Sequence, residues 1–181
     1  MSNVPRLNFR KLLRETGGAE IAEAAAVLPV MFMIVLGIFW FGQAFRIYGT
    51  ITRAAQDGAR AAAAPYCMTC TSANTPAVNA SNAVQAGLQA AHLDPSQITP
   101  LSKWTPPTVV DCVTGSAVAC TDKGGVCVQT NVLLVDSTSA EPVCGVSVSF
   151  EYPYQFWLPF TTLNQQQLQL QAIARVKAEV P

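Results

Sequence analysis

An uncharged run of nineteen residues near the start of the chain is the clearest feature of its hydrophobic and polar pattern. The run covers residues 24–42, and as a helix rising 1.5 Å per residue it would be about 28 Å long. This length is close to the roughly 30 Å hydrocarbon thickness of a bilayer. A secretory signal peptide has a shorter apolar core with a cleavage site soon after it, whereas Gln43, Phe45 and Arg46 follow here. We therefore predict a retained transmembrane helix.

The helical pattern continues beyond the apolar run as far as Pro65. Small and apolar side chains recur there at steps of three and four residues, opposite three arginines, as in an amphipathic helix. The stripe consists of Phe45, Tyr48, Ile51, Ala55, Gly58 and Ala62, and the arginines are Arg46, Arg53 and Arg60. We predict one long helix over residues 20–64, whose second half is the spine of an exported domain.

The remainder of the chain shows a mixture of helix and strand patterns. Thr75-Pro76 begins a short amphipathic segment with Val84 and Leu88 on one face, and a proline-rich connector over residues 94–107 follows. Apolar and polar residues then alternate, as in half-buried strands, in three segments: 126–134, 146–152 and 168–178. The predicted fold class is α+β, with a long N-terminal helix and an antiparallel sheet covered by helix on one face.

Composition and charge agree with a membrane anchor attached to a small exported domain. Half of the 181 residues are hydrophobic and 12% are charged, about half the charged fraction of a typical soluble protein. The residues before Ala19 carry four basic side chains and one acidic side chain, so the positive-inside rule places the N-terminus in the cytoplasm. The region beyond the apolar run is nearly neutral, which gives no electrostatic footprint for nucleic acid.

Six cysteines follow the predicted span: Cys67, Cys70, Cys112, Cys120, Cys127 and Cys144. An even number in a small domain is typical of disulfides formed in an oxidising compartment. Cys67-x-x-Cys70 could also be a redox motif or half of a zinc site, but the lone histidine, His92, has no ligand-like spacing. We predict structural disulfides and no metal site, with fifteen possible pairings. Cys127 and Cys144 should not pair, because a hairpin placing Cys144 opposite Val135 would hold them about 27 Å apart.

The exported region has no recognisable set of catalytic residues. It contains a single histidine and has neither a glycine-rich phosphate loop, a Ser-x-x-Lys motif nor clustered carboxylates. We therefore predict that the protein is not an enzyme and uses no cofactor. Its richest aromatic cluster comprises Tyr152, Tyr154, Phe156, Trp157 and Phe160. These side chains would pack on the domain core or contact another subunit or the membrane surface.

Two carboxylates, Glu20 and Glu23, stand at the start of the apolar run, just after the Gly17-Gly18 pair that ends the basic leader. A carboxylate at headgroup level costs little, so both could simply rest at the membrane interface. Together, however, the leader, the glycine and the glutamate resemble a type IV prepilin. The resemblance implies cleavage after Gly18, with Ala19 as the first mature residue and Glu23 as the fifth.

Residues 17–64 as a whole resemble the TadE/TadG-like pseudopilins of the type IVb (Flp, tight-adherence) pilus machinery. The matching elements are Glu23, Val27-Leu28-Pro29, Gly37, Phe41-Gly42 and the Ala-Ala-x-Asp-Gly-Ala-Arg segment over residues 54–60. The resemblance implies a leader (1–18) removed by a prepilin peptidase, a transmembrane and spine helix (19–64) and an exported disulfide-containing domain (65–181).

The same resemblance implies a single-pass protein of the cytoplasmic membrane that supports pilus biogenesis and adhesion and associates with other pilins or pseudopilins. In such an assembly, the carboxylate of Glu23 would face the Ala19 ammonium of a neighbouring subunit. The alternative is a signal-anchored envelope protein whose disulfide-bonded domain binds a ligand or partner and never enters a filament.

Overall fold

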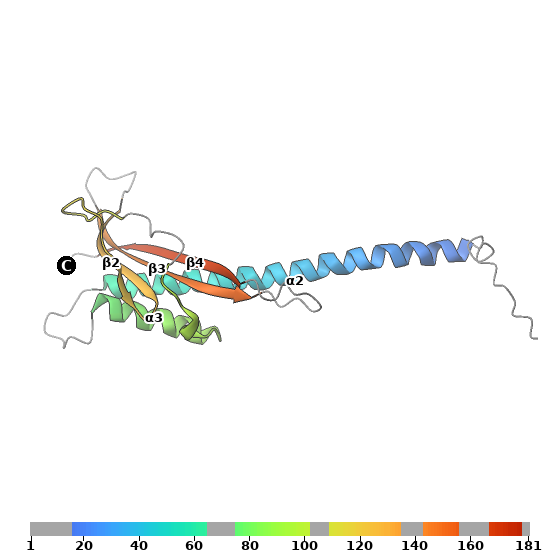
Figure 1. Cartoon of the computed structure of the whole chain (residues 1–181), viewed down its shortest axis with the longest axis horizontal. Coiled ribbons are helices and arrows are strands. Elements are labelled where there is room, and N and C mark those ends of the chain that lie inside the picture. The colour runs from blue at the N-terminus through green and yellow to red at the C-terminus, as the bar shows by residue number, and fades with distance from the viewer. Residues whose placement is uncertain (1–15, 65–74, 102–108, 135–142, 156–166, 179–181) are drawn as a thin grey trace, which may run out of the picture. The chain divides into compact units, whose positions relative to one another are not determined.

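The computed structural model describes residues 16–64, 75–101, 109–134, 143–155 and 167–178, with backbone only for 16–20. Its elements, in chain order, are α2 (Thr16–Ala63), α3 (Pro76–Ala90), the 3-10 turn η1 (Pro95–Gln97), β1 (Thr121–Lys123), β2 (Val126–Leu134), β3 (Val143–Gln155) and β4 (Gln167–Lys177) (Figure 1). This arrangement confirms the predicted α+β class. The chain divides into two compact units, Met1–Gln43 and Ala44–Pro181.

The first unit contains the N-terminal part of α2, a helix of 48 residues that continues through Pro29. In the described part of the chain, one helix, over Ile21–Ala63, is long and apolar enough to cross a bilayer. Its most apolar window is entirely unburied, whereas the core helix of a soluble protein would be covered on at least one face. The helix therefore indicates a single-pass membrane anchor, as the sequence predicted.

In the second unit, α3 forms where the sequence predicted a short amphipathic helix. Thr75 caps its N-terminus, because the side-chain oxygen accepts a hydrogen bond from the N–H of Val78, and Pro76 fits the first turn, where its missing N–H has no helical partner. The helix ends at Ala90 with Ala91 as its C-cap, and the next residue, His92, adopts a positive φ of 60°. The N–H of Leu93 then donates to the Leu88 carbonyl and that of His92 to the Gln89 carbonyl. His92 therefore lies in the turn that follows the C-terminus of α3.

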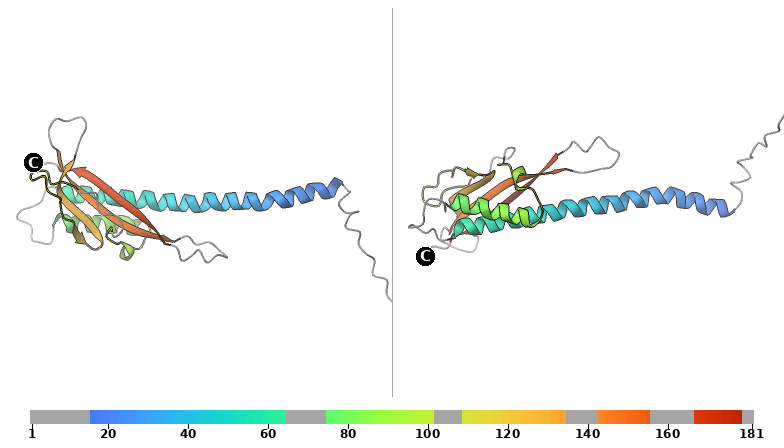
Figure 2. Two further views of the ribbon diagram at one scale, coloured as in Figure 1. Left: turned by 45° about the horizontal axis from the view of Figure 1, so that its top comes forward. Right: turned by 90° about the horizontal axis from the view of Figure 1, so that it is seen from below.

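The four strands form an antiparallel sheet in the order β1-β2-β3-β4, and Figure 2 shows both helices on one face of it. Val148 pairs with Val128 on β2 and with Ala174 on β4, so the apolar alternation of all three strands points to the same side. Val148 is completely buried, and burial of a valine side chain stabilises a fold by about 1.5 to 3 kcal/mol. The three predicted strands are confirmed, and β1 was missed.

Small residues let α2 approach α3 and the sheet closely. The buried face of α2 consists of Ile51, Ala54, Ala55, Gly58, Ala59 and Ala62. A Cβ atom at Gly58 would lie only 2.6 Å from Cγ2 of Val84 and 3.3 Å from the carbonyl oxygen of Ala80. Ala54, Gly58 and Ala62, which are spaced four apart, are therefore part of an internal packing surface of the second unit.

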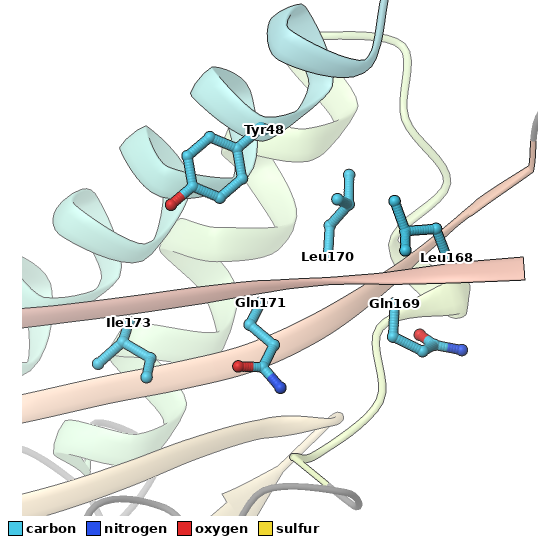
Figure 3. Close-up of a pocket in the computed structure, with 6 residues that line it drawn as sticks. All are labelled: Tyr48, Leu168, Gln169, Leu170, Gln171 and Ile173. Atoms are coloured by element: carbon cyan, nitrogen blue, oxygen red, sulfur yellow. The ribbon is translucent and has the colours of Figure 1, made fainter. Parts of the chain in front are cut away.

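The predicted stripe on α2 was wrong at its N-terminal end. Phe45 and Tyr48 were placed on it, but they are 71% and 49% exposed. Tyr48 projects beside the outer edge of β4 instead of into the core (Figure 3). The buried face of α2 begins at Ile51. The three- and four-residue spacing of apolar residues extends N-terminally beyond Ile51, but the side chains of Phe45 and Tyr48 there are not covered.

Candidate functional site

The residues predicted for cleavage and assembly lie close together at the start of α2. The helix begins at Thr16, so Gly18 and Ala19 lie in its first turn, and Glu23 follows one turn after Ala19. The Glu23 side chain is exposed. The first backbone N–H groups of a helix have no partner within it, and the positive end of the helix dipole favours negative charge nearby. Glu23 is the eighth residue of α2, so it lies beyond the first turn, where these effects act, and that turn contains no acidic residue.

Apolar side chains surround the helix beyond Glu23. The exposed set comprises Val27, Leu28, Val30, Met31, Phe32, Met33, Ile34, Val35, Ile38, Phe39 and Phe41. A helix that is apolar on all sides suits lipid or other apolar helices and not water. The indole N–H of Trp40 is buried and has no hydrogen-bond partner among the described residues. This part of α2 can therefore pack laterally against other helices within a membrane.

Among the described residues two disulfides stabilise the second unit, Cys112–Cys144 and Cys120–Cys127, with Cα atoms 5.6 and 5.4 Å apart. These spacings are ordinary for bonded cysteines. The expectation that Cys127 and Cys144 do not pair is confirmed. The expected register of the hairpin was wrong by two residues. Cys144 lies opposite Leu133 and not Val135, and β2 ends at Leu134, before Val135 is reached. Cys67 and Cys70 lie outside the described residues, and so does any bond between them.

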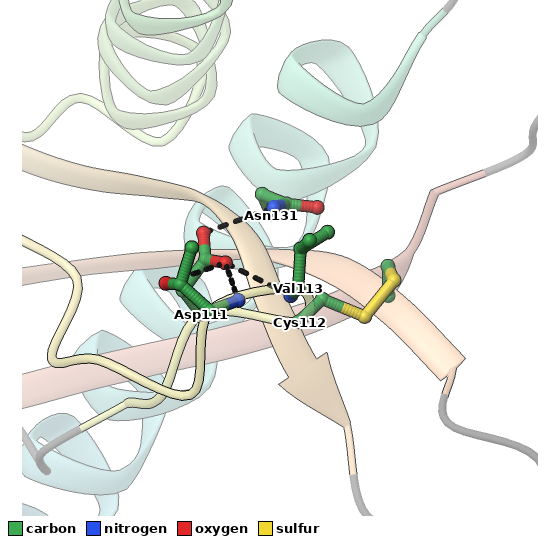
Figure 4. The surroundings of a disulfide bond; sticks show 6 residues. Asp111, Cys112, Val113 and Asn131 are labelled. Atoms are coloured by element: carbon green, nitrogen blue, oxygen red, sulfur yellow. Dashed lines mark hydrogen bonds between the residues drawn. A yellow bond between two sulfur atoms is a disulfide. The ribbon is translucent and has the colours of Figure 1, made fainter.

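The Cys112–Cys144 disulfide anchors a loop that Asp111 organises (Figure 4). The Asp111 carboxylate accepts hydrogen bonds from the N–H groups of Thr114 (2.8 Å) and Val113 (2.9 Å) and from Nδ2 of Asn131 (2.9 Å). These bonds favour the ionised form and lower the pKa of Asp111 to about 2. The sequence analysis missed this structural site, although an aspartate followed by Thr114-Gly115 is a turn signal.

The aromatic cluster divides between described and undescribed residues. Tyr152 and Tyr154 are 5% and 6% exposed on β3, which matches the interpretation of core packing for these two. The Tyr152 hydroxyl accepts a hydrogen bond from the N–H of Asp94 at 3.2 Å, and burial raises its pKa. Phe156, Trp157 and Phe160 lie outside the described residues, so the alternative of a membrane or subunit contact remains a prediction for them.

Comparison with known proteins relates the N-terminal helix to a family. The chain as a whole matches no curated protein and no solved structure. One segment of the chain matches a family model. This segment begins at Gly18, includes Glu23 and the apolar run, and ends at Arg60, two residues after Gly58, where α2 approaches α3 closely. The resemblance found in the sequence is confirmed: residues 18–60 match the family model of the TadE-like protein, and the chain carries a TadE-like helix.

Proposed function

We propose that this protein is a non-enzymatic, pseudopilin-like component of a type IVb (Tad/Flp) pilus assembly system that supports pilus biogenesis and adhesion. The observation that carries the proposal is the TadE-like match over residues 18–60, which begins at the predicted cleavage residue and includes Glu23. The exposed apolar surface of α2 supports lateral packing in a membrane. A TadE-like helix suggests a role in Tad pilus systems, and the pseudopilin role is the more specific proposal.

The proposed topology follows from charge and from cysteine chemistry. The basic residues before Ala19 favour a cytoplasmic N-terminus in the inner membrane. The two disulfides of the domain require an oxidising compartment, which favours export of the part beyond α2. A prepilin peptidase would cleave after Gly18, and the new N-terminus at Ala19 would remain at the cytoplasmic face.

Glu23 has a specific role in this proposal. Cleavage creates an ammonium on Ala19, and in an assembly this ammonium would lie near the Glu23 carboxylate of a neighbouring subunit. Two unit charges 4 Å apart attract by about 4 kcal/mol at an effective dielectric constant of 20, before the costs of desolvation and ordering. An isolated subunit leaves both charges unpaired at the edge of the hydrocarbon. Pairing between subunits therefore favours association and sets their axial register.

Substitution of Glu23 by glutamine tests this role. The variant keeps the size and polarity of the side chain but removes its charge, so membrane insertion should persist while co-purification with pilin-like subunits after cross-linking should fall. Glu20→Gln is the matched control, because it changes a carboxylate three residues away and outside the fifth mature position. Equal recovery of partners with Glu23→Gln and wild type, or an equal defect in both variants, would contradict the ion-pair role.

The disulfide-bonded domain alone would fit a second function equally well. A signal-anchored envelope protein that binds a ligand would need the same anchor and the same two disulfides. The TadE-like match favours the assembly role over this alternative. An envelope receptor would retain its leader and would not associate with pilin-like subunits.

A further inference from the structure

Among the residues that the structure describes, β4 has β3 as its neighbour on one side and no strand on its outer side. Glu151 on β3 exchanges both of its backbone hydrogen bonds with Thr99, at 3.0 and 2.8 Å, on the side away from β4. Because backbone groups alternate sides along a strand, the even-numbered residues of β4 bond to β3. The odd-numbered residues, including Gln169, Gln171 and Ile173, direct their N–H and C=O groups outward. In the described part of the chain, no strand pairs with this edge.

Over residues 167–174 this edge also lacks the features that usually prevent strands from pairing with other proteins. Natural edge strands are commonly short, bulged, charged or interrupted by proline. β4 instead has 11 residues and pairs with β3 without a register shift, from Gln167 to Lys177. It has no proline, and its first charged residue is Arg175. A long, regular and largely uncharged edge is suited to accepting another strand.

A groove of about 520 Å³ lies beside the edge, lined by Tyr48, Leu168, Gln169, Leu170, Gln171 and Ile173. Figure 3 shows Leu168 and Leu170 directed toward the α2 side of the strand, with Tyr48 of that helix above them. Leu168 is 47% exposed and Tyr48 is 49% exposed. A further strand would lie about 4.8 Å beyond β4. Its alternate side chains would then enter the groove and cover these apolar groups.

We propose that the edge of β4 accepts an extended segment of a different subunit of the assembly as a fifth strand of the sheet. The segment would carry apolar side chains at alternate positions facing α2, and an acidic side chain near Arg175 and Lys177. Both cations are exposed, and among the described residues neither forms an ion pair. This is β-strand addition, in which backbone hydrogen bonds provide affinity and the groove provides selectivity.

A second copy of this chain fits the edge less well. Antiparallel pairing of β4 with its own copy requires a two-fold axis. β4 runs in the same direction as the adjoining part of α2, from residue 44 onward (Figures 1 and 2). The axis would turn this helix segment in opposite directions in the two copies, whereas two chains anchored in one membrane enter it from the same side. The other edge strand of the sheet, β1, has three residues, so it is too short to pair along the 11-residue β4 of a second copy.

A proline substitution tests the proposal directly. Ile173→Pro removes an N–H that faces outward and leaves the bonds between β3 and β4 intact, because proline is tolerated on the free side of an edge strand. The control is Ile173→Ala, which shortens the same side chain and retains the N–H. We expect Ile173→Pro to reduce co-purification with pilin-like subunits at least tenfold, Ile173→Ala, which loses only groove contacts, to reduce it much less, and both variants to melt near the wild-type temperature.

Amide hydrogen exchange on the wild-type chain provides a measurement that needs no substitution. In the cross-linked assembly, compared with the isolated full chain in detergent micelles, the amides of Gln169, Gln171 and Ile173 should exchange at least tenfold more slowly. The even-numbered amides, already bonded to β3, should change little. Unchanged exchange at the odd positions, or normal association of a folded Ile173→Pro variant, overturns the proposal.

The inference rests on the proposed assembly role, and the two can fail separately. If wild type binds pilin-like subunits without protection of β4, the strand addition is wrong and the assembly role stands. If wild type binds none of them, the assembly role fails and this inference fails with it. Protection of β4 by a second copy of the chain alone also overturns the proposed occupant.

Discussion

Substitution of Gly58 by alanine should destabilise the second unit, residues 44–181, although alanine is the better helix former. In the interior of an exposed helix this change stabilises by about 1 kcal/mol. At Gly58 the added Cβ would lie 2.6 Å from Cγ2 of Val84 and 3.3 Å from the backbone oxygen of Ala80. Val84 is completely buried and, being β-branched, has few rotamers through which to move away. Overpacking of this kind costs about 1 to 3 kcal/mol, so the expected net change is a loss of up to about 2 kcal/mol.

Gly49→Ala is the matched control on the same helix. No atom lies within 4 Å of a Cβ placed there, so the helix-propensity gain should appear alone, as about 0.5 to 1 kcal/mol of stabilisation. The assay is equilibrium unfolding of the full chain in detergent micelles, followed by a signal from the second unit. Gly58→Ala should unfold at lower denaturant and Gly49→Ala at equal or higher denaturant than wild type. If the two variants are equally stable, the close approach of α2 to α3 does not constrain position 58.

Three further predictions concern pH, cysteines and processing. The folded pKa of Asp111 is lowered to about 2 from its ordinary value of 3.8, so its stabilising effect is present above about pH 4 and is lost as the pH falls toward 2. The melting temperature of wild type should therefore fall more steeply over this range than that of Asp111→Asn. Parallel curves for the two proteins would refute the role of the ionised Asp111 carboxylate. Alkylation of the denatured, unreduced protein followed by peptide mapping should find no free thiol at any of the six cysteines, and labelling of two or more would contradict a framework of three disulfides. Gly18→Leu should leave the chain at full length in a host with a prepilin peptidase, whereas Gly17→Leu should matter less; equal mobility of Gly18→Leu and wild type on a gel would contradict cleavage at this site.

Periodicity was sufficient to predict the regular elements of this fold. The apolar run and its amphipathic continuation gave α2, Val84 and Leu88 gave the buried face of α3, and period-two alternation gave β2, β3 and β4. The pattern of α2 repeats over several turns and each strand pattern over at least four positions, so one apolar residue at a polar position of β4, Ile173, did not obscure it. Such patterns report which face of an element is apolar.

The features missed depend on contacts that periodicity does not encode. β1 has three exposed residues and is joined to β2 by Gly124 and Gly125, which have φ values of 61° and 81°. Alternation on β3 suggested a polar outer face, yet Ser147 and Glu151 are 2% and 1% exposed. Glu151 accepts a hydrogen bond from Nε2 of Gln171 at 3.2 Å, which offsets part of the cost of its burial.

The candidate site shows the same division. Gly18 and Glu23 were identified through a family resemblance, because neither the charge of a glutamate nor the flexibility of a glycine indicates a peptidase or a neighbouring subunit. Gly58 and Ala62 were placed on the predicted stripe of α2, but the partners of this face became clear only with α3 and β3 in place. The open edge of β4 required the strand order, which alternation along one strand does not specify.

Determination of the N-terminus of the mature protein in its native membrane tests the central claim most directly. N-terminal sequencing of the purified protein, together with its intact mass, distinguishes a processed pseudopilin from an uncleaved signal anchor. The pseudopilin proposal predicts a chain that begins at Ala19, lacks residues 1–18 and has Glu23 as its fifth residue. A chain that retains this leader in a strain with an active prepilin peptidase would contradict the proposal.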